Sequence, residues 1–152
     1  MLQKIYLKGL WISTIAILLL SALQGLSGHW IVLFLLWPGG PASGTTFIQA
    51  MGDLSTYHRI AGFVTGALSI LVLFFAFFSK ATIYVRVFAV LGFAMTALAA
   101  IGGILYVTSR FLDRWSLGQM ADAFVGVFGV YFIQLFFMNK TPKFPWSRVK
   151  AS

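Results

Sequence analysis

Residues 60–78 read IAGFVTGALSILVLFFAFF and contain no charged side chain. A helix needs about 20 predominantly apolar residues to cross the hydrocarbon core of a bilayer, so this stretch predicts a transmembrane helix. Such a helix pairs its own backbone N–H and C=O groups, which lipid cannot do. The stretch therefore indicates an integral membrane protein.

Three further stretches have the same character, at about residues 9–37, 87–107 and 118–138, and none contains Lys or Arg. Together the four stretches predict an all-α, integral membrane four-helix bundle over residues 1–139, followed by a basic tail at 140–152. The Pro- and Gly-containing segment 38–57 is expected to form one long loop. Residues 80–86 and 109–116 are expected to form tight links.

Composition supports a membrane protein. The 152 residues are 60% hydrophobic and 9% charged, with a mean hydropathy of +0.93, whereas a soluble domain carries about 25% charged residues. The chain has no cysteine, which excludes disulfides, Cys-ligated zinc, iron–sulfur clusters and thiolate ligation of heme.

The net charge of +8 is interpreted as a topology signal. Eight of the eleven Lys and Arg residues fall before the first stretch, between the second and third, or after the fourth; these are Lys4, Lys8, Lys80, Arg86, Lys140, Lys143, Arg148 and Lys150. If the helices alternate in direction, these eight share one side of the membrane. By the positive-inside rule both termini are cytoplasmic. We therefore expect a multi-pass protein of the cytoplasmic (plasma) membrane, in contact with the lipid bilayer and not with nucleic acid.

The two histidines each end a stripe of small residues spaced four apart, and residues four apart share a helix face. The stripes are Ser21-xxx-Gly25-xxx-His29 and His58-xxx-Gly62-xxx-Gly66. Small residues leave room for a flat ligand, and histidine is a common axial ligand of heme in helical bundles. Small residues equally allow bare helices to pack closely, so the spacing leaves both interpretations open.

A family resemblance bears on this choice. The segment Tyr57-His58-Arg59-Ile60-Ala61-Gly62 resembles the His-Arg start of a helix in heme A synthases. Three further segments are similar to the corresponding parts of that family: Leu23-Gln24-Gly25, Trp37-Pro38-Gly39 and Ala100-Ile101-Gly102-Gly103. The whole chain would correspond to one four-helix half of such an enzyme, and it also resembles small four-helix b-type cytochromes. The resemblance implies a heme b with His58 as an axial ligand and Arg59 on a propionate.

The sequence departs from this family at one place. The family has a partner histidine near the start of the fourth helix, where residues 117–124 here read LGQMADAF. Three alternatives follow: Met120 ligates the iron through its thioether, His29 does so, or heme is absent.

Asp122 is the one acidic residue inside a predicted helix. A carboxylate in the membrane is costly unless it is paired or protonated. It is expected either to form an interhelical salt bridge with Arg59, Arg110 or Arg114, or to accept a proton beside a quinol or heme.

These observations predict a heme-binding membrane protein of respiratory electron transfer, with a quinol as a candidate small-molecule partner. The alternative is a cofactor-free accessory subunit that stabilises a larger respiratory or other membrane protein complex. An enzyme of heme modification is a third hypothesis, and the missing fourth-helix histidine argues against it.

Overall fold

The computed structural model describes residues 2–36, 45–108 and 114–139. Over these ranges the chain forms four α-helices and no strand. They are α1 (Leu2–Leu36), α2 (Thr45–Phe78), α3 (Ile83–Thr108) and α4 (Arg114–Asn139). The prediction of an all-α chain with four helices is confirmed.

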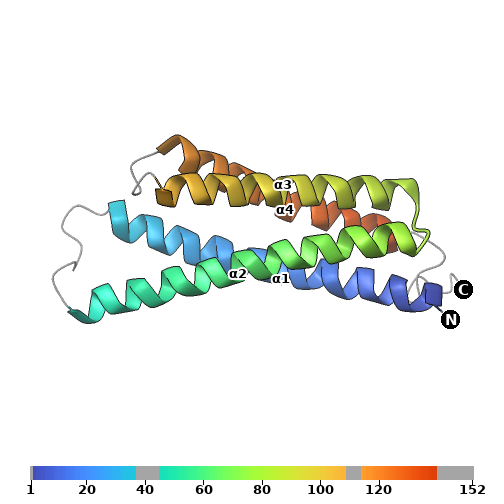
Figure 1. The fold of residues 1–152 in the computed structure, drawn as a ribbon, viewed down its shortest axis with the longest axis horizontal. Helices are drawn as coiled ribbons and strands as arrows, with labels where there is room; N and C mark the ends of the chain where they lie inside the picture. The colour runs from blue at the N-terminus through green and yellow to red at the C-terminus, as the bar shows by residue number, and fades with distance from the viewer. Residues whose placement is uncertain (1, 37–44, 109–113, 140–152) are drawn as a thin grey trace, which may run out of the picture.

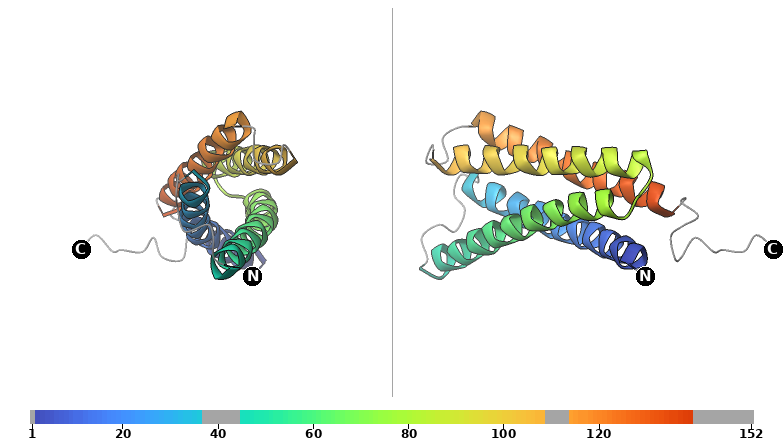
Figure 2. Two further views of the ribbon diagram at one scale, coloured as in Figure 1. Left: turned by 90° about the vertical axis from the view of Figure 1, so that its left-hand side faces the viewer. Right: turned by 45° about the vertical axis from the view of Figure 1, so that its right-hand side comes forward.

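The helices run up and down, so the Leu2 end of α1 and the Asn139 end of α4 lie at the same end of the bundle (Figure 1). We call this the inner end, following the predicted orientation, and the opposite end the outer end. Within the described ranges α1 packs on α2, α2 on α3, α3 on α4 and α4 on α1, while the diagonal pairs α1/α3 and α2/α4 make no comparable contact. Toward its Thr45 end α2 leans away from α3 (Figure 2).

All four helices are long and apolar enough to cross a membrane. The apolar spans are Leu2–Gly28, Thr56–Phe78, Ile83–Tyr106 and Leu117–Asn139. Length and composition therefore fit a multi-pass membrane protein. The identity of the membrane and the inside position of the termini stay predictions.

The helix boundaries correct parts of the predicted layout. Helix α2 begins at Thr45, so much of the expected loop at 38–57 is helical. The cluster of Pro and Gly residues ends at Gly44, and the segment that follows has no proline to break a helix. The link expected at 80–86 is also shorter, since α3 begins at Ile83. Residues 37–44, 109–113 and the tail 140–152 lie outside the described residues.

The hydrophobic core fills the middle and inner part of the bundle. Its buried members come from all four helices and from the link between α2 and α3: Leu7, Leu10, Ile17, Val72, Ala76, Ala81, Val85, Ala89, Val127, Tyr131 and Met138. At the inner end Lys80 has a φ of 52°, which reverses the chain after α2. Gln3 Nε2 donates to the Ser79 carbonyl at 3.3 Å and so ties α1 to this turn.

Helices α3 and α4 approach closely around Tyr131. A Cβ atom at Gly92 would lie 2.5 Å from the Tyr131 ring, so this position requires glycine. The Tyr131 hydroxyl lies beside the hydroxyls of Ser69 and Thr96, without a hydrogen bond of ordinary geometry to either. Gln134 Nε2 donates to the Val85 carbonyl at 3.3 Å. Polar groups therefore reach across the helices even in the core.

Candidate functional site

His58 lies near the outer end of α2 and faces α1. Its Nδ1 atom is 3.1 Å from Ser27 Oγ. A Cβ atom at Gly28 would lie 3.1 Å from His58 Cε1, so Gly28 allows the imidazole to rest against the α1 backbone. The ring is half-buried between these two helices.

The hydrogen bonds around Ser27 favour one tautomer of His58. Ser27 Oγ also lies 3.1 Å from the Gln24 carbonyl, and a hydroxyl has one hydrogen to donate. Both contacts are satisfied when Ser27 donates to that carbonyl and His58 Nδ1–H donates to Ser27 Oγ. His58 Nε2 then carries a lone pair, and it has no hydrogen-bond partner among the described residues.

Gln24 ties α1 to α2 beside the imidazole. Its Nε2 atom donates to the His58 carbonyl at 3.5 Å. Its Oε1 atom lies 3.0 Å from Thr65 Oγ1, whose one hydrogen is shared between this oxygen and the Ala61 carbonyl at 2.8 Å. A Cβ atom at Gly62 would lie 3.2 Å from Gln24 Nε2. From the sequence, Gln24 was noted only within the segment Leu23-Gln24-Gly25 that is similar to heme A synthases. The signal that could have identified it is a lone amide within an apolar span, which commonly bonds to a neighbouring helix.

We call Gln24, Ser27, His58 and Thr65 the α1/α2 clasp. Two glycines of the small-residue stripes, Gly25 and Gly62, are covered by side chains. Gly25 faces the ring of Phe124 from α4, to which a Cβ atom would lie at 2.9 Å, and Gly62 faces Gln24. A flat ligand at either glycine would have to displace those side chains. At Gly66 a Cβ atom would meet nothing within 4 Å.

Met120 belongs to the other helix pair. Its Sδ atom is 3.4 Å from the position of a Cβ atom at Gly103, so Met120 packs on the glycine pair of α3. The backbones of the diagonal helices α2 and α4 do not approach each other closely in the described ranges. No contact in the structure brings Met120 and His58 together.

The remaining predicted site residues lie near the outer end. Arg59 is exposed, and its Nη2 atom is 3.4 Å from Thr56 Oγ1. His29 lies on α1 and Arg114 begins α4, but their side chains are outside the described part of the chain, as is Arg110.

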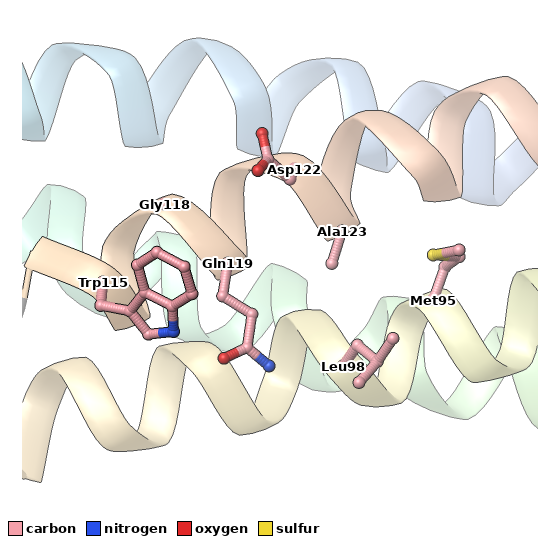
Figure 3. Close-up of a pocket in the computed structure, with 7 residues that line it drawn as sticks. All are labelled: Met95, Leu98, Trp115, Gly118, Gln119, Asp122 and Ala123. Atoms are coloured by element: carbon pink, nitrogen blue, oxygen red, sulfur yellow. The ribbon is translucent and has the colours of Figure 1, made fainter.

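A groove on the outer half of α3 and α4 carries the membrane carboxylate. Its volume is about 500 Å³. Seven of the described residues line it: Met95, Leu98, Trp115, Gly118, Gln119, Asp122 and Ala123. Figure 3 shows Gln119 reaching from α4 toward α3, with Asp122 one turn further along α4. We call this feature the Asp122 groove.

Asp122 is exposed and makes no hydrogen bond or ion pair within the described part of the chain. The expected salt bridge with Arg59 is not formed. The expected partners Arg110 and Arg114 fall on side chains that the structure does not describe. Gln119 likewise has no hydrogen bond among the described residues.

The described residues contain no group of three His, Cys, Asp or Glu side chains that could hold a metal ion. Comparisons with protein-family models, with curated proteins and with solved structures find no match to this chain. Among the described residues, the polar groups of the outer end form two features, a hydrogen-bonded clasp between α1 and α2 and an open polar groove on α3 and α4.

Proposed function

We propose that this protein is an accessory subunit that stabilises a larger membrane complex by packing its α4 face against a partner. The observation that carries this proposal is the exposed Asp122 carboxylate in the membrane-spanning part of α4, which lacks a partner among the described residues. Other polar groups on the same helix reach a neighbouring helix, as Gln134 does.

The position of Asp122 makes a carboxylate without a partner costly. The residue lies five positions inside the apolar span that begins at Leu117, which corresponds to about 7.5 Å along a helix. An aspartate at the centre of a membrane helix costs about 2.5–3.5 kcal/mol on insertion scales, and less toward the interface. A partner that pairs with Asp122 would recover this free energy.

Two glycines on α4 support the same proposal. At Gly118 and Gly129 a Cβ atom would meet nothing within 4 Å, so the fold of this chain does not require glycine there. Small residues are enriched where transmembrane helices pack on one another. A partner helix would approach α4 closely at these positions.

The test is extraction in a gentle detergent followed by native gel electrophoresis. The wild-type chain is expected to migrate with partner chains, and Asp122→Asn is expected to release it as a free bundle of unchanged helicity. Thr108→Val is the control, because Thr108 is exposed on α3 and bonds only to its own helix in the described structure, at the Leu105 carbonyl. A wild-type chain that is a lone monomer in every detergent would contradict the proposal.

Heme binding at His58, in membrane electron transfer, is a second candidate function. One observation favours it: His58 Nδ1 lies 3.1 Å from Ser27 Oγ. In the tautomer inferred above Nε2 keeps a lone pair, and metal-ligating histidines are usually held in this way through their other ring nitrogen. Arg59 would hold a propionate, and Met120 or His29 would be the second ligand. Side chains at Gly25 and Gly62 would have to move to admit a porphyrin.

Absorbance of the purified protein tests this second candidate. A Soret band and a reduced α band that His58→Ala abolishes would support it. The variants His29→Ala and Met120→Ala would then identify the second ligand by which of them shifts the reduced spectrum. A colourless preparation with full helicity would rule it out.

A further inference from the structure

We infer that the inner end of α2 and α3 binds an anionic phospholipid, whose phosphate is held by Arg86 with help from Lys80. The link between α2 and α3 lies at the same end of the bundle as the Leu2 end of α1 (Figure 1). The site is at the opposite end from Asp122 and does not depend on the proposed accessory role.

Arg86 is a partly buried cation inside an apolar span. It lies three residues after Ile83, where the span begins, which corresponds to about 4.5 Å along the helix. Its Cζ atom is 5.9 Å from the centre of the Phe77 ring on α2, and its Nε atom is buried without a hydrogen-bond acceptor among the described residues. Because the guanidinium is partly removed from water, an anion at its other N–H groups is attracted more strongly than at a fully solvated arginine.

No acidic side chain of this sequence can reach Arg86. The chain has three acidic residues, Asp53, Asp113 and Asp122. About 36 Å of continuous helix separates Asp53 from Phe77 on α2. Asp113 directly precedes the outer start of α4, and Asp122 lies on the outer half of the same helix. The anion that neutralises Arg86 is therefore not a carboxylate side chain of this chain.

Lys80 adds a second positive charge at the same end. It lies in the link between α2 and α3, six residues before Arg86, and its side chain is exposed. Arginine binds phosphate oxygens through charge-assisted N–H···O bonds, and basic groups between transmembrane helices recognise anionic lipid headgroups. The pair therefore suits a phosphodiester.

The surface beside Arg86 suits the acyl chains of the same lipid. Ile70 and Phe77, seven residues apart on α2, are both exposed, as is Val90, one turn after Arg86 on α3. Residues four or seven apart share a helix face, so these apolar side chains lead from the guanidinium toward the middle of the bundle. A phospholipid uses both the cations and this surface, whereas a soluble anion uses only the cations.

The test measures which lipid lies beside Arg86. Because the chain has no cysteine, Val90→Cys provides a single thiol for a bimane label. The labelled full chain is placed in vesicles of phosphatidylcholine and phosphatidylglycerol, and one of the two lipids carries bromine atoms on its acyl chains, which quench bimane. Comparing the quenching by the two brominated lipids gives the preference for phosphatidylglycerol over phosphatidylcholine at this position.

Phosphatidylglycerol is expected to be preferred. Arg86→Gln is expected to lower the preference about fivefold, which corresponds to about 1 kcal/mol for one cation near anionic lipid. Arg86→Lys keeps the charge and is expected to keep most of the preference. Lys80→Gly removes the second cation, suits the positive φ of 52° at this position, and is expected to cause a smaller loss. Equal quenching by the two lipids in the chain with Arg86 would overturn the inference.

Two controls separate this site from the general attraction of a basic protein for anionic lipid. Lys8→Gln removes one charge at the same end, on α1, whose backbone does not approach α3 closely in the described ranges, and is expected to change the preference less than about twofold. A label at Val125→Cys, an exposed position on α4, is expected to show no preference. Equal losses in Lys8→Gln and Arg86→Gln would overturn the inference.

Inorganic phosphate is the competing occupant, because it offers similar oxygens without acyl chains. An excess of phosphate, with chloride at the same ionic strength as the reference, is expected to leave the preference intact. Loss of the preference in phosphate but not in chloride would assign Arg86 to a soluble anion and overturn the inference.

Discussion

In the outer half of the bundle, polar side chains are hydrogen-bonded between α1 and α2, whereas those on α3 and α4 are open. Between α1 and α2, Gln24 and Ser27 bond to His58 and the facing helix. On α3 and α4, Asp122 and Gln119 line an open groove without hydrogen bonds among the described residues. Both helix pairs consist of apolar helices long enough to cross a membrane, so the difference lies in how these polar side chains are packed.

This contrast separates polar groups that hold the chain together from polar groups that are available to a partner. Interhelical hydrogen bonds in membranes contribute about 0.6 kcal/mol on average and up to about 1.7 kcal/mol. The clasp therefore stabilises the isolated bundle. Asp122 and Gln119 add no hydrogen bond to the isolated bundle among the described residues, so any stabilisation they give depends on what binds there.

The largest expected difference in the free energy of unfolding is between alanine substitutions at two glycines of the α3/α4 pair. Gly92→Ala would place a Cβ atom 2.5 Å from the buried Tyr131 ring and is expected to lower the free energy of unfolding by about 1–3 kcal/mol through overpacking. Gly118→Ala, which meets open space, is expected to change it by less than about 0.5 kcal/mol. Unfolding in bicelles by detergent titration measures both, and equal effects would show that the outer half is packed as closely as the core.

The next largest difference in stability is expected between leucine substitutions at Gln24, in the clasp, and at Gln119, in the groove. Gln24→Leu leaves the Thr65 hydroxyl and the His58 carbonyl without their partner on α1 and is expected to cost about 1–2 kcal/mol. Gln119→Leu removes no hydrogen bond made by the described residues and is expected to leave stability unchanged. The same titration applies, and a Gln24→Leu variant as stable as the wild type would remove the basis for the clasp.

A smaller effect tests the contact between Ser27 and His58. Ser27→Ala is expected to cost about 0.6 kcal/mol. In a double-mutant cycle with His58→Phe the two losses are expected to be less than additive, because both substitutions remove the same hydrogen bond. Strictly additive losses would mean that the 3.1 Å contact contributes no coupling energy.

Much of the fold could be predicted because the apolar runs are long. The stretch 60–78 alone identifies a spanning helix, and four such runs give the number of helices. The helical segment from Thr45 was missed because its polar residues resemble a loop in sequence. Helix α2 continues there because an α-helix that leaves the apolar region still satisfies its own backbone.

The site was harder to predict, because a sequence gives depth along each helix and not the neighbour that a residue faces. The small-residue stripe at Gly25 could hold a flat ligand or a side chain, and the structure places Phe124 there. Gln24 gave no periodic signal. Asp122 was identified as the unusual acidic residue, and its exposure on the outer half of α4 became visible only in three dimensions.

The most direct test of the central claim is native mass spectrometry of the gently extracted protein, with wild type and Asp122→Asn compared side by side. The account predicts a wild-type species heavier than the single chain and an Asp122→Asn species at the mass of the single chain, with equal helicity for both. A complex of unchanged mass in Asp122→Asn, or a wild-type protein present only as a monomer, would contradict the claim that the exposed carboxylate of α4 holds a partner.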